Sequence, residues 1–144
     1  MTQNVAIAGF SGYIGTHITQ AALDLGLQVY GIDPFLNESF KNHDRFQKVK
    51  SIDAFCNLRT DCFYLALQPN HRGPYLNRLI KDGRLILSET PMARARDPEK
   101  CDALVNALTG SGATIYYNFL FLYNPVTYYT IEFLRKHPTA KIAI

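Results

Sequence analysis

The chain has 144 residues, of which 47% are hydrophobic and 19% are charged; this is the length of a single domain, and the balance excludes a disordered chain. The formal net charge of +3 is too small to indicate a nucleic-acid partner. We expect no membrane segment either, because no apolar run approaches the roughly 20 residues that span a bilayer.

Short apolar runs alternate with amphipathic stretches along the chain, which is the pattern of a parallel α/β sheet. The predicted strands are 4–8, 27–32, 46–49, 62–67, 84–88 and 113–119. The predicted helices are 12–24, 52–58, 74–81, 97–110 and 125–135, with a loop or short helix after residue 34. The sequence therefore predicts an α/β fold, a doubly wound parallel sheet of the Rossmann type with strand order 3-2-1-4-5-6.

The turn between the first predicted strand and the first predicted helix is rich in glycine. A dinucleotide fold needs glycines there for a tight turn, for the approach of the pyrophosphate, and for close helix–strand packing. The helix N-terminus adds N–H donors and a partial positive charge. The residues that we predict to bind the cofactor here are Gly9, Phe10, Ser11, Gly12, Tyr13, Ile14 and Gly15. The alternative is a purely structural turn.

Asp33 ends the second predicted strand, where an acidic residue accepts hydrogen bonds from the adenosine ribose hydroxyls. No arginine follows it before Arg45, so no obvious cation is placed to bind the 2′-phosphate of NADP. We interpret the mildly basic run from Lys41 to Lys50 as a solvated face. The cofactor prediction is therefore NAD in preference to NADP. The alternative role of Asp33 is that of a turn residue before Pro34.

The glycine spacing itself resembles that of extended short-chain dehydrogenases and epimerases. Those enzymes need a Tyr-x-x-x-Lys pair, in which the lysine lowers the tyrosine pKa for general acid–base catalysis. No lysine of this chain has a tyrosine four residues before it. A fragment of such an enzyme stays an alternative only if its catalytic half lies outside these residues.

Two further segments follow the fourth and fifth predicted strands, namely Leu67-Gln68-Pro69-Asn70 and Glu89-Thr90-Pro91. Their order and spacing resemble those of the Gfo/Idh/MocA family of oxidoreductases. Members of that family carry a Pro-Asn turn after the fourth strand and a Glu-Lys-Pro motif after the fifth. The resemblance extends from Asn4 to the helix start at Asn124-Pro125.

The resemblance implies NAD(P)-dependent hydride transfer on a sugar, a cyclitol or a similar small alcohol or carbonyl compound. It places seven more residues at the dinucleotide: Leu67, Gln68, Pro69, Asn70, Glu89, Thr90 and Pro91. Glu89 and Pro91 would lie beside the nicotinamide ring, and a cis peptide bond would precede Pro91. The implied division is a Rossmann domain over 1–124 and, over 125–144, a linking helix and the start of a strand leading to a second α/β domain.

The sequence departs from the family pattern in three places. Thr90 replaces the lysine that helps the family to bind substrate and to shuttle its proton. Gly73 stands where the family often has a histidine, and Leu122 stands where it often has an arginine. The catalytic residues therefore stay unknown, and a non-catalytic nucleotide-binding or sensor module is a second interpretation. A small-molecule substrate is expected only with a second domain or chain.

The end of the chain is rich in aromatic residues, since eight of them lie between 116 and 133. We predict that this segment contacts a missing domain or a second copy of the chain, because residues 140–144 look like the start of an unpaired strand. The alternative is ordinary core packing.

The cysteines Cys56, Cys62 and Cys101 lack the spacing of a zinc site. The N-terminus also lacks the basic stretch of a signal peptide. We therefore expect no metal, and we predict reduced thiols in the cytoplasm.

Overall fold

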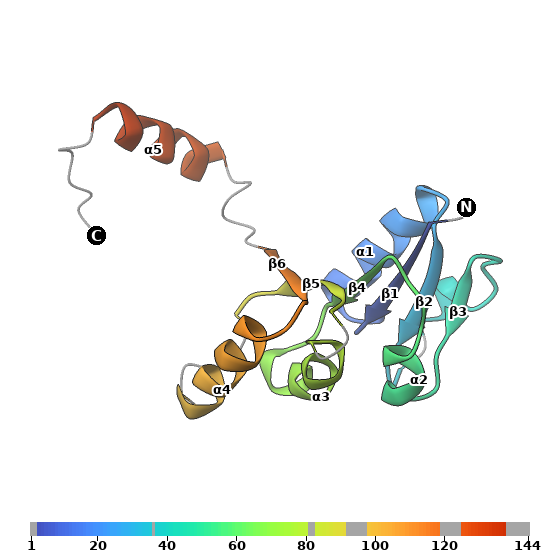
Figure 1. Cartoon of the computed structure of the whole chain (residues 1–144). Helices are drawn as coiled ribbons and strands as arrows, with labels where there is room; N and C mark the ends of the chain where they lie inside the picture. The colour runs from blue at the N-terminus through green and yellow to red at the C-terminus, as the bar shows by residue number, and fades with distance from the viewer. Residues whose placement is uncertain (1–2, 36, 81–82, 92–97, 119–124, 138–144) are drawn as a thin grey trace.

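The computed structural model describes residues 3–35, 37–80, 83–91, 98–118 and 125–137. Six strands form one sheet in the order β3-β2-β1-β4-β5-β6 (Figure 1), and all five pairings are parallel. The strands are β1 (Asn4–Ala8), β2 (Gln28–Ile32), β3 (Phe46–Lys48), β4 (Cys62–Leu65), β5 (Leu85–Glu89) and β6 (Thr114–Asn118). The predicted doubly wound Rossmann-type sheet, with its strand order, is confirmed.

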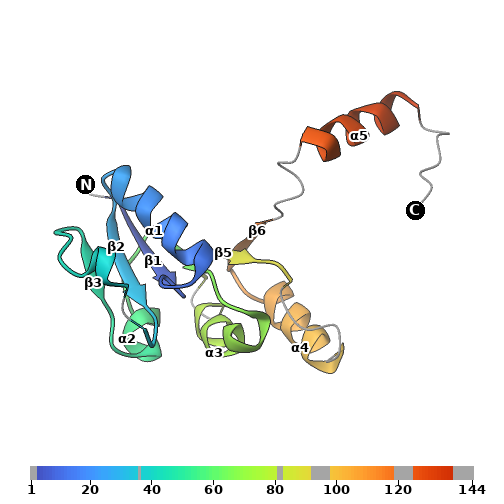
Figure 2. The same ribbon diagram turned by 180° about the vertical axis from the view of Figure 1, so that it is seen from behind.

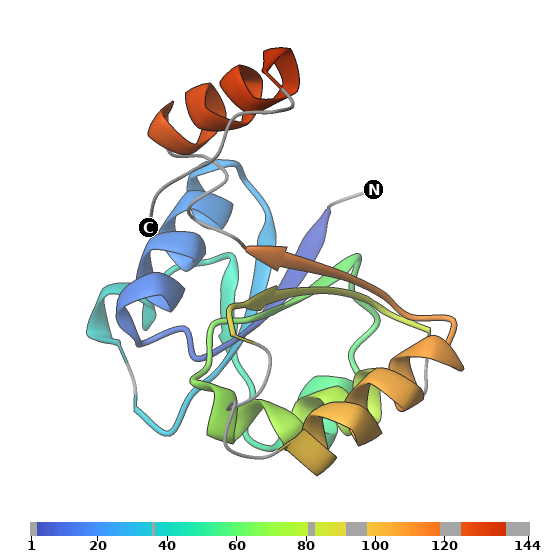
Figure 3. The same cartoon turned by 90° about the vertical axis from the view of Figure 1, so that its left-hand side faces the viewer.

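Helices cover the two faces of this sheet unequally (Figures 1 and 3). The helices are α1 (Tyr13–Asp24), α2 (Ile52–Cys56), α3 (Pro69–Leu79), α4 (Pro98–Thr109) and α5 (Pro125–Lys136), with a 3₁₀ turn, η1 (Glu38–Phe40). α1 lies on one face, and α2, α3 and α4 lie on the other, as right-handed crossovers in two directions from β1 require. α5 stands apart from the sheet in Figures 1 and 2. No described helix has the length and apolarity to cross a membrane.

The two central strands are buried on both faces, because helices lie above and below them. In β4, Phe63 and Leu65 are fully buried on the α3 side, whereas Tyr64 packs with Ile7 and Phe10 on the α1 side. This explains their continuous apolar sequence. Side chains at the β6 edge are less covered: Leu85 is 40% exposed and Tyr116 is 59% exposed.

The helix after β4 begins at Pro69, so the predicted start at Pro74 is wrong. Pro69 takes the first helical position, where a missing N–H costs no hydrogen bond and the fixed φ suits the helix. Pro74 lies inside the helix and removes only the bond to the carbonyl of Asn70. One face of α3 is packed against the sheet and offsets this loss; its buried residues are Arg72, Tyr75, Leu76 and Leu79.

Several predictions fall outside the described residues. They concern Leu122, the aromatic residues at 119, 121 and 123, and the strand at 140–144. In the described part of the aromatic segment, Tyr129 is 70% exposed and Phe133 is 55% exposed. The contact with a second domain or copy stays a prediction.

Candidate functional site

Gly9 begins the glycine-rich turn in a conformation that favours glycine, with φ at +83°. A Cβ at this position would lie 2.5 Å from the carbonyl oxygen of Ala66, just beyond the end of β4. The Gly9 N–H donates to the carbonyl of Ile32 at the end of β2, at 2.9 Å. The turn is thus held against the ends of β2 and β4, at the point where the strand order reverses direction.

Gly12 and Gly15 lack a side chain for different reasons. A Cβ on Gly15 would lie 1.9 Å from the carbonyl oxygen of Gly9, so only glycine lets α1 pack this closely on the turn. Gly12 has an ordinary φ of −72°, and a Cβ there would meet only the Gly9 oxygen, at 3.4 Å. A side chain on Gly12 would therefore fill the space in front of the helix N-terminus without disturbing the turn.

The N-terminus of α1 has donors but no side-chain cap. The N-cap residue is Gly12, which has no side chain to accept a hydrogen bond from the N–H groups of the first turn. The first N–H groups of a helix have no partner within the helix, and they carry the positive end of its dipole. With the open space at Gly12, this arrangement suits an anion such as a phosphate.

Asp33 joins the loop after β2 to the glycine-rich turn. Its Oδ2 accepts the Ser11 N–H at 3.1 Å, and its Oδ1 accepts the Phe35 N–H at 2.9 Å. The Ser11 hydroxyl also donates to the carbonyl of Phe35, at 3.1 Å. A carboxylate offers about four acceptor positions, so each oxygen retains one for a ligand hydroxyl. Asp33 is therefore a turn residue and keeps the capacity to bind a ribose.

Lys48 is exposed, as predicted for a solvated face, and it also lies at this end of the site. Its Nζ donates to the carbonyl of Phe35 at 3.4 Å. The signal for it was the parallel register of β2 and β3, which pairs Lys48 with Gly31. The predicted strand order already made β2 the partner of β3, but a single sequence does not supply the register of the pair.

Arg72 connects the segments that follow β4 and β5, and sequence reasoning missed it. Arg72 is 2% exposed. Its Nε donates to the carbonyl of Leu67 at 2.6 Å, and its Nη1 donates to the carbonyls of Glu89 and Pro91. Burial lowers the pKa of Arg72, and Glu89 opposes that shift. The predicted cis peptide bond between Thr90 and Pro91 is confirmed.

A network of three side chains lies at the ends of β4, β5 and β6. The Tyr64 hydroxyl donates to Glu89 Oε1, and Asn118 Nδ2 donates to the same oxygen at 2.9 Å. Asn118 Nδ2 also lies 3.3 Å from the Tyr64 hydroxyl. Burial, and then the Glu89 carboxylate, raise the pKa of Tyr64 well above its ordinary value. Tyr64 is thus a neutral donor at physiological pH.

The predicted site residues therefore collect at one edge of the sheet, the carboxyl ends of β1, β2, β4 and β5. Gln68 and Asn70 are exposed there, and Asn70 Nδ2 lies 3.1 Å from His71 Nε2. The Thr90 hydroxyl donates to the carbonyl of Asn118, at 3.4 Å. Sequence reasoning missed Tyr64 and Asn118, although strand alternation puts both on the face that carries Glu89.

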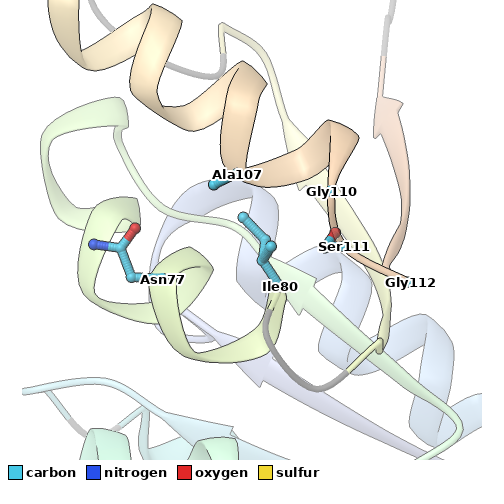
Figure 4. A pocket seen from close by; sticks show the side chains of 6 residues that line it. All are labelled: Asn77, Ile80, Ala107, Gly110, Ser111 and Gly112. Atoms are coloured by element: carbon cyan, nitrogen blue, oxygen red, sulfur yellow. The ribbon is translucent and has the colours of Figure 1, made fainter.

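A hollow of about 560 Å³ lies elsewhere, between α3 and α4 (Figure 4). It is lined by Asn77, Ile80, Ala107, Gly110, Ser111 and Gly112. These residues precede β5 and β6, so the hollow lies toward the amino ends of the strands, opposite the edge described above. None of these described lining residues is charged. Among the described residues, no cluster of three histidine, cysteine, aspartate or glutamate side chains could hold a metal ion.

Of the comparisons with known proteins, the one with solved structures supports the fold. No family model matches the sequence, and no curated protein matches it. Among solved structures, the chain is similar to the WlbA dehydrogenase of Thermus thermophilus in complex with NAD and UDP-GlcNAcA, with TM-score 0.72 and 22% identity over 94% of this chain and 48% of that one. It is also similar to the 3-ketoreductase KijD10 of Actinomadura kijaniata in complex with NADP and TDP-benzene, with TM-score 0.72 and 18% identity over 94% and 43%. The chain spans less than half the length of these proteins.

Proposed function

We propose that this chain binds a nicotinamide dinucleotide across the carboxyl ends of β1, β2, β4 and β5. It would serve as the cofactor-binding part of an oxidoreductase that transfers hydride to or from a sugar, a cyclitol or a similar small alcohol or carbonyl compound. The observation that carries the proposal is the uncapped N-terminus of α1 with open space at Gly12, because a diphosphate needs both.

The positions of the predicted residues along the sheet edge support this proposal. Gly9–Gly15 would hold the diphosphate, and Asp33 would accept hydrogen bonds from the adenosine ribose. In a doubly wound sheet the two nucleotide halves lie on opposite sides of the switch point. The nicotinamide would therefore lie over β4 and β5, near residues 67–70 and 89–91.

Asp33 supports NAD over NADP, because its carboxylate would repel a 2′-phosphate. Lys48 is the opposing influence, since its ammonium group is at the same end of the site. An exposed lysine contributes little at physiological salt, so we expect NAD to be preferred by about tenfold. The resemblance to proteins solved with NAD and with NADP supports a nicotinamide dinucleotide of either kind.

The bound cofactor would supply the hydride chemistry, and the protein would bind and orient it. We assign no catalytic residue, because Thr90 replaces the lysine of the Glu-Lys-Pro motif. The substrate pocket would need a second domain or a second chain, so the 144 residues should bind cofactor without appreciable turnover. We further propose a cytoplasmic location, on the cysteine argument given above.

A non-catalytic nucleotide sensor is the second candidate, and the Thr90 hydroxyl favours it. That hydroxyl donates to the Asn118 carbonyl, so it is directed at the backbone and is not a proton shuttle. The substitution Thr90→Lys, made in the chain together with a substrate-binding part, separates the two candidates. A large gain in turnover indicates a drifted enzyme, and no gain indicates a sensor.

The test of cofactor binding is a fluorescence titration of the chain with NADH and NADPH, with ADP-ribose measured by calorimetry. We expect saturable binding of NADH and ADP-ribose, with NADPH about tenfold weaker. Gly12→Val is the matched variant, because it fills the space in front of α1 and should abolish binding of both ligands. Failure of the wild-type chain to bind any of them would overturn the proposal. A preference for NADPH would overturn the Asp33 argument alone.

A further inference from the structure

The three-residue network at the ends of β4, β5 and β6 orients one carboxylate. Tyr64 and Asn118 both donate to Oε1 of Glu89. Tyr64 is only 6% exposed, and a side chain so confined has few alternative positions. Because two donors from two strands converge on one oxygen, the carboxylate is fixed in orientation.

The second oxygen of Glu89 is in a different situation. No described residue donates a hydrogen bond to Oε2 in the structure, while Oε1 receives two. A half-buried carboxylate such as that of Glu89 is stabilised by a donor on each of its oxygens. The arrangement thus presents an oriented acceptor at the nicotinamide side of the site.

We propose that Tyr64 and Asn118 are positioning residues that hold Glu89 so that its Oε2 accepts a hydrogen bond from the nicotinamide nucleoside. This inference rests on the proposed function. The donors of that nucleoside are its carboxamide N–H groups and its ribose hydroxyls. The adenosine half makes no contact with this network, because it would lie over β1 and β2 on the other side of the switch point.

The substitution Glu89→Gln tests the acceptor directly. Glutamine has the same shape, and its oxygen can take the place of Oε1 and accept from Tyr64 and Asn118. Its NH₂ group then stands where Oε2 stood, so the ligand loses a charged acceptor, and a carboxamide N–H would face another donor. We expect the NADH dissociation constant to rise by about tenfold or more, the effect of losing a hydrogen bond to a charged group. ADP, which lacks both the nicotinamide and its ribose, should bind within about twofold of wild type.

The substitution Tyr64→Phe tests the positioning role. It removes one donor to Oε1 and leaves the charge of Glu89 in place. We expect NADH to bind about threefold to tenfold more weakly, and the fluorescence maximum of bound NADH to shift toward that of free NADH. ADP binding should not change. Tyr30→Phe is the matched control, since Tyr30 is a strand tyrosine of β2 and should leave both ligands unaffected.

The outcomes separate this inference from the proposed function. If the wild-type chain binds neither NADH nor ADP, the proposed function fails. If it binds both, and E89Q and Y64F weaken NADH alone, the inference holds. Equal weakening of both ligands, or no change in either, overturns it. The acetylpyridine analogue of NADH, which lacks the carboxamide N–H, identifies the donor. A smaller E89Q effect on the analogue indicates the carboxamide, and an equal effect indicates a ribose hydroxyl.

Discussion

The two sides of the sheet's carboxyl edge differ in the groups that form them: backbone on one side and side chains on the other. On the β1–β2 side, the glycine-rich turn presents backbone: glycines at 9, 12 and 15 and the N–H groups of α1. On the β4–β6 side, the edge is formed by buried side chains. Arg72 joins the loops after β4 and β5, and Tyr64 donates a hydrogen bond to Glu89. A backbone site needs neighbouring residues, whereas a side-chain site gathers residues from distant strands.

The difference also matches the chemistry of the two proposed ligand halves. The β1–β2 side offers N–H donors and a helix dipole, which suit the two negative charges of a diphosphate. The β4–β6 side uses its buried cation on backbone carbonyls and presents one carboxylate. That arrangement suits a neutral group with hydrogen-bond donors. Substitutions on the two sides should therefore have different effects on stability and on ligand binding, and comparing them tests this contrast.

The largest expected effect is that of Gly15→Ala on the backbone side. The new Cβ would lie 1.9 Å from a backbone oxygen, and no side-chain rotation relieves such a contact. We expect the free energy of unfolding to fall by about 4 kcal/mol, measured by urea denaturation. Gly12→Ala is the control, with an expected loss below about 1 kcal/mol. Similar losses for the two variants would contradict the packing role given to Gly15.

Arg72→Met is the corresponding change on the side-chain side. It leaves the carbonyls of Leu67, Glu89 and Pro91 without this donor, and we expect a loss of about 3 kcal/mol in the free energy of unfolding. Arg72→Lys should recover only part of it, because an ammonium group lacks the planar fork that reaches several acceptors. Full recovery by lysine would show that the charge matters and the geometry does not.

This contrast explains how much could be predicted from the sequence. The strand order, the glycine-rich turn and Asp33 follow from local pattern, because their residues are contiguous or end a strand. The role of Arg72 could not be predicted with the helix started at Pro74, since that start placed Arg72 in a loop. Tyr64 and Asn118 needed the register of β4, β5 and β6, which one sequence does not supply.

Asp33→Asn is expected to have a smaller effect, confined to the adenosine side. Asparagine has one oxygen where Asp33 uses two to accept the N–H groups of Ser11 and Phe35. Its NH₂ group then faces an N–H donor, which should cost about 2 kcal/mol of stability. NADH binding should weaken by about tenfold, with NADPH weakened less. An equal loss for both cofactors would show that Asp33 supports only the loop.

The smallest effect is a pH dependence specific to Tyr64. In the unfolded chain a tyrosine ionises with a pKa of about 10, whereas burial raises the pKa of Tyr64 in the fold. The stability from a neutral Tyr64 is therefore fully present below pH 10 and is lost as the pH rises above it. At pH 11 the unfolded state has gained about 1.4 kcal/mol from this group, while the folded state has gained nothing.

The measurement is the difference in free energy of unfolding between wild type and Tyr64→Phe, followed from pH 8 to pH 11. Because the other tyrosines titrate in both proteins, their contributions cancel. The difference should stay constant to about pH 9.5 and then fall by about 1.4 kcal/mol by pH 11. Parallel curves would mean that Tyr64 ionises as easily in the fold as outside it. The β4–β6 side would then not be a buried side-chain site, and the contrast with the glycine-rich turn would lose its basis.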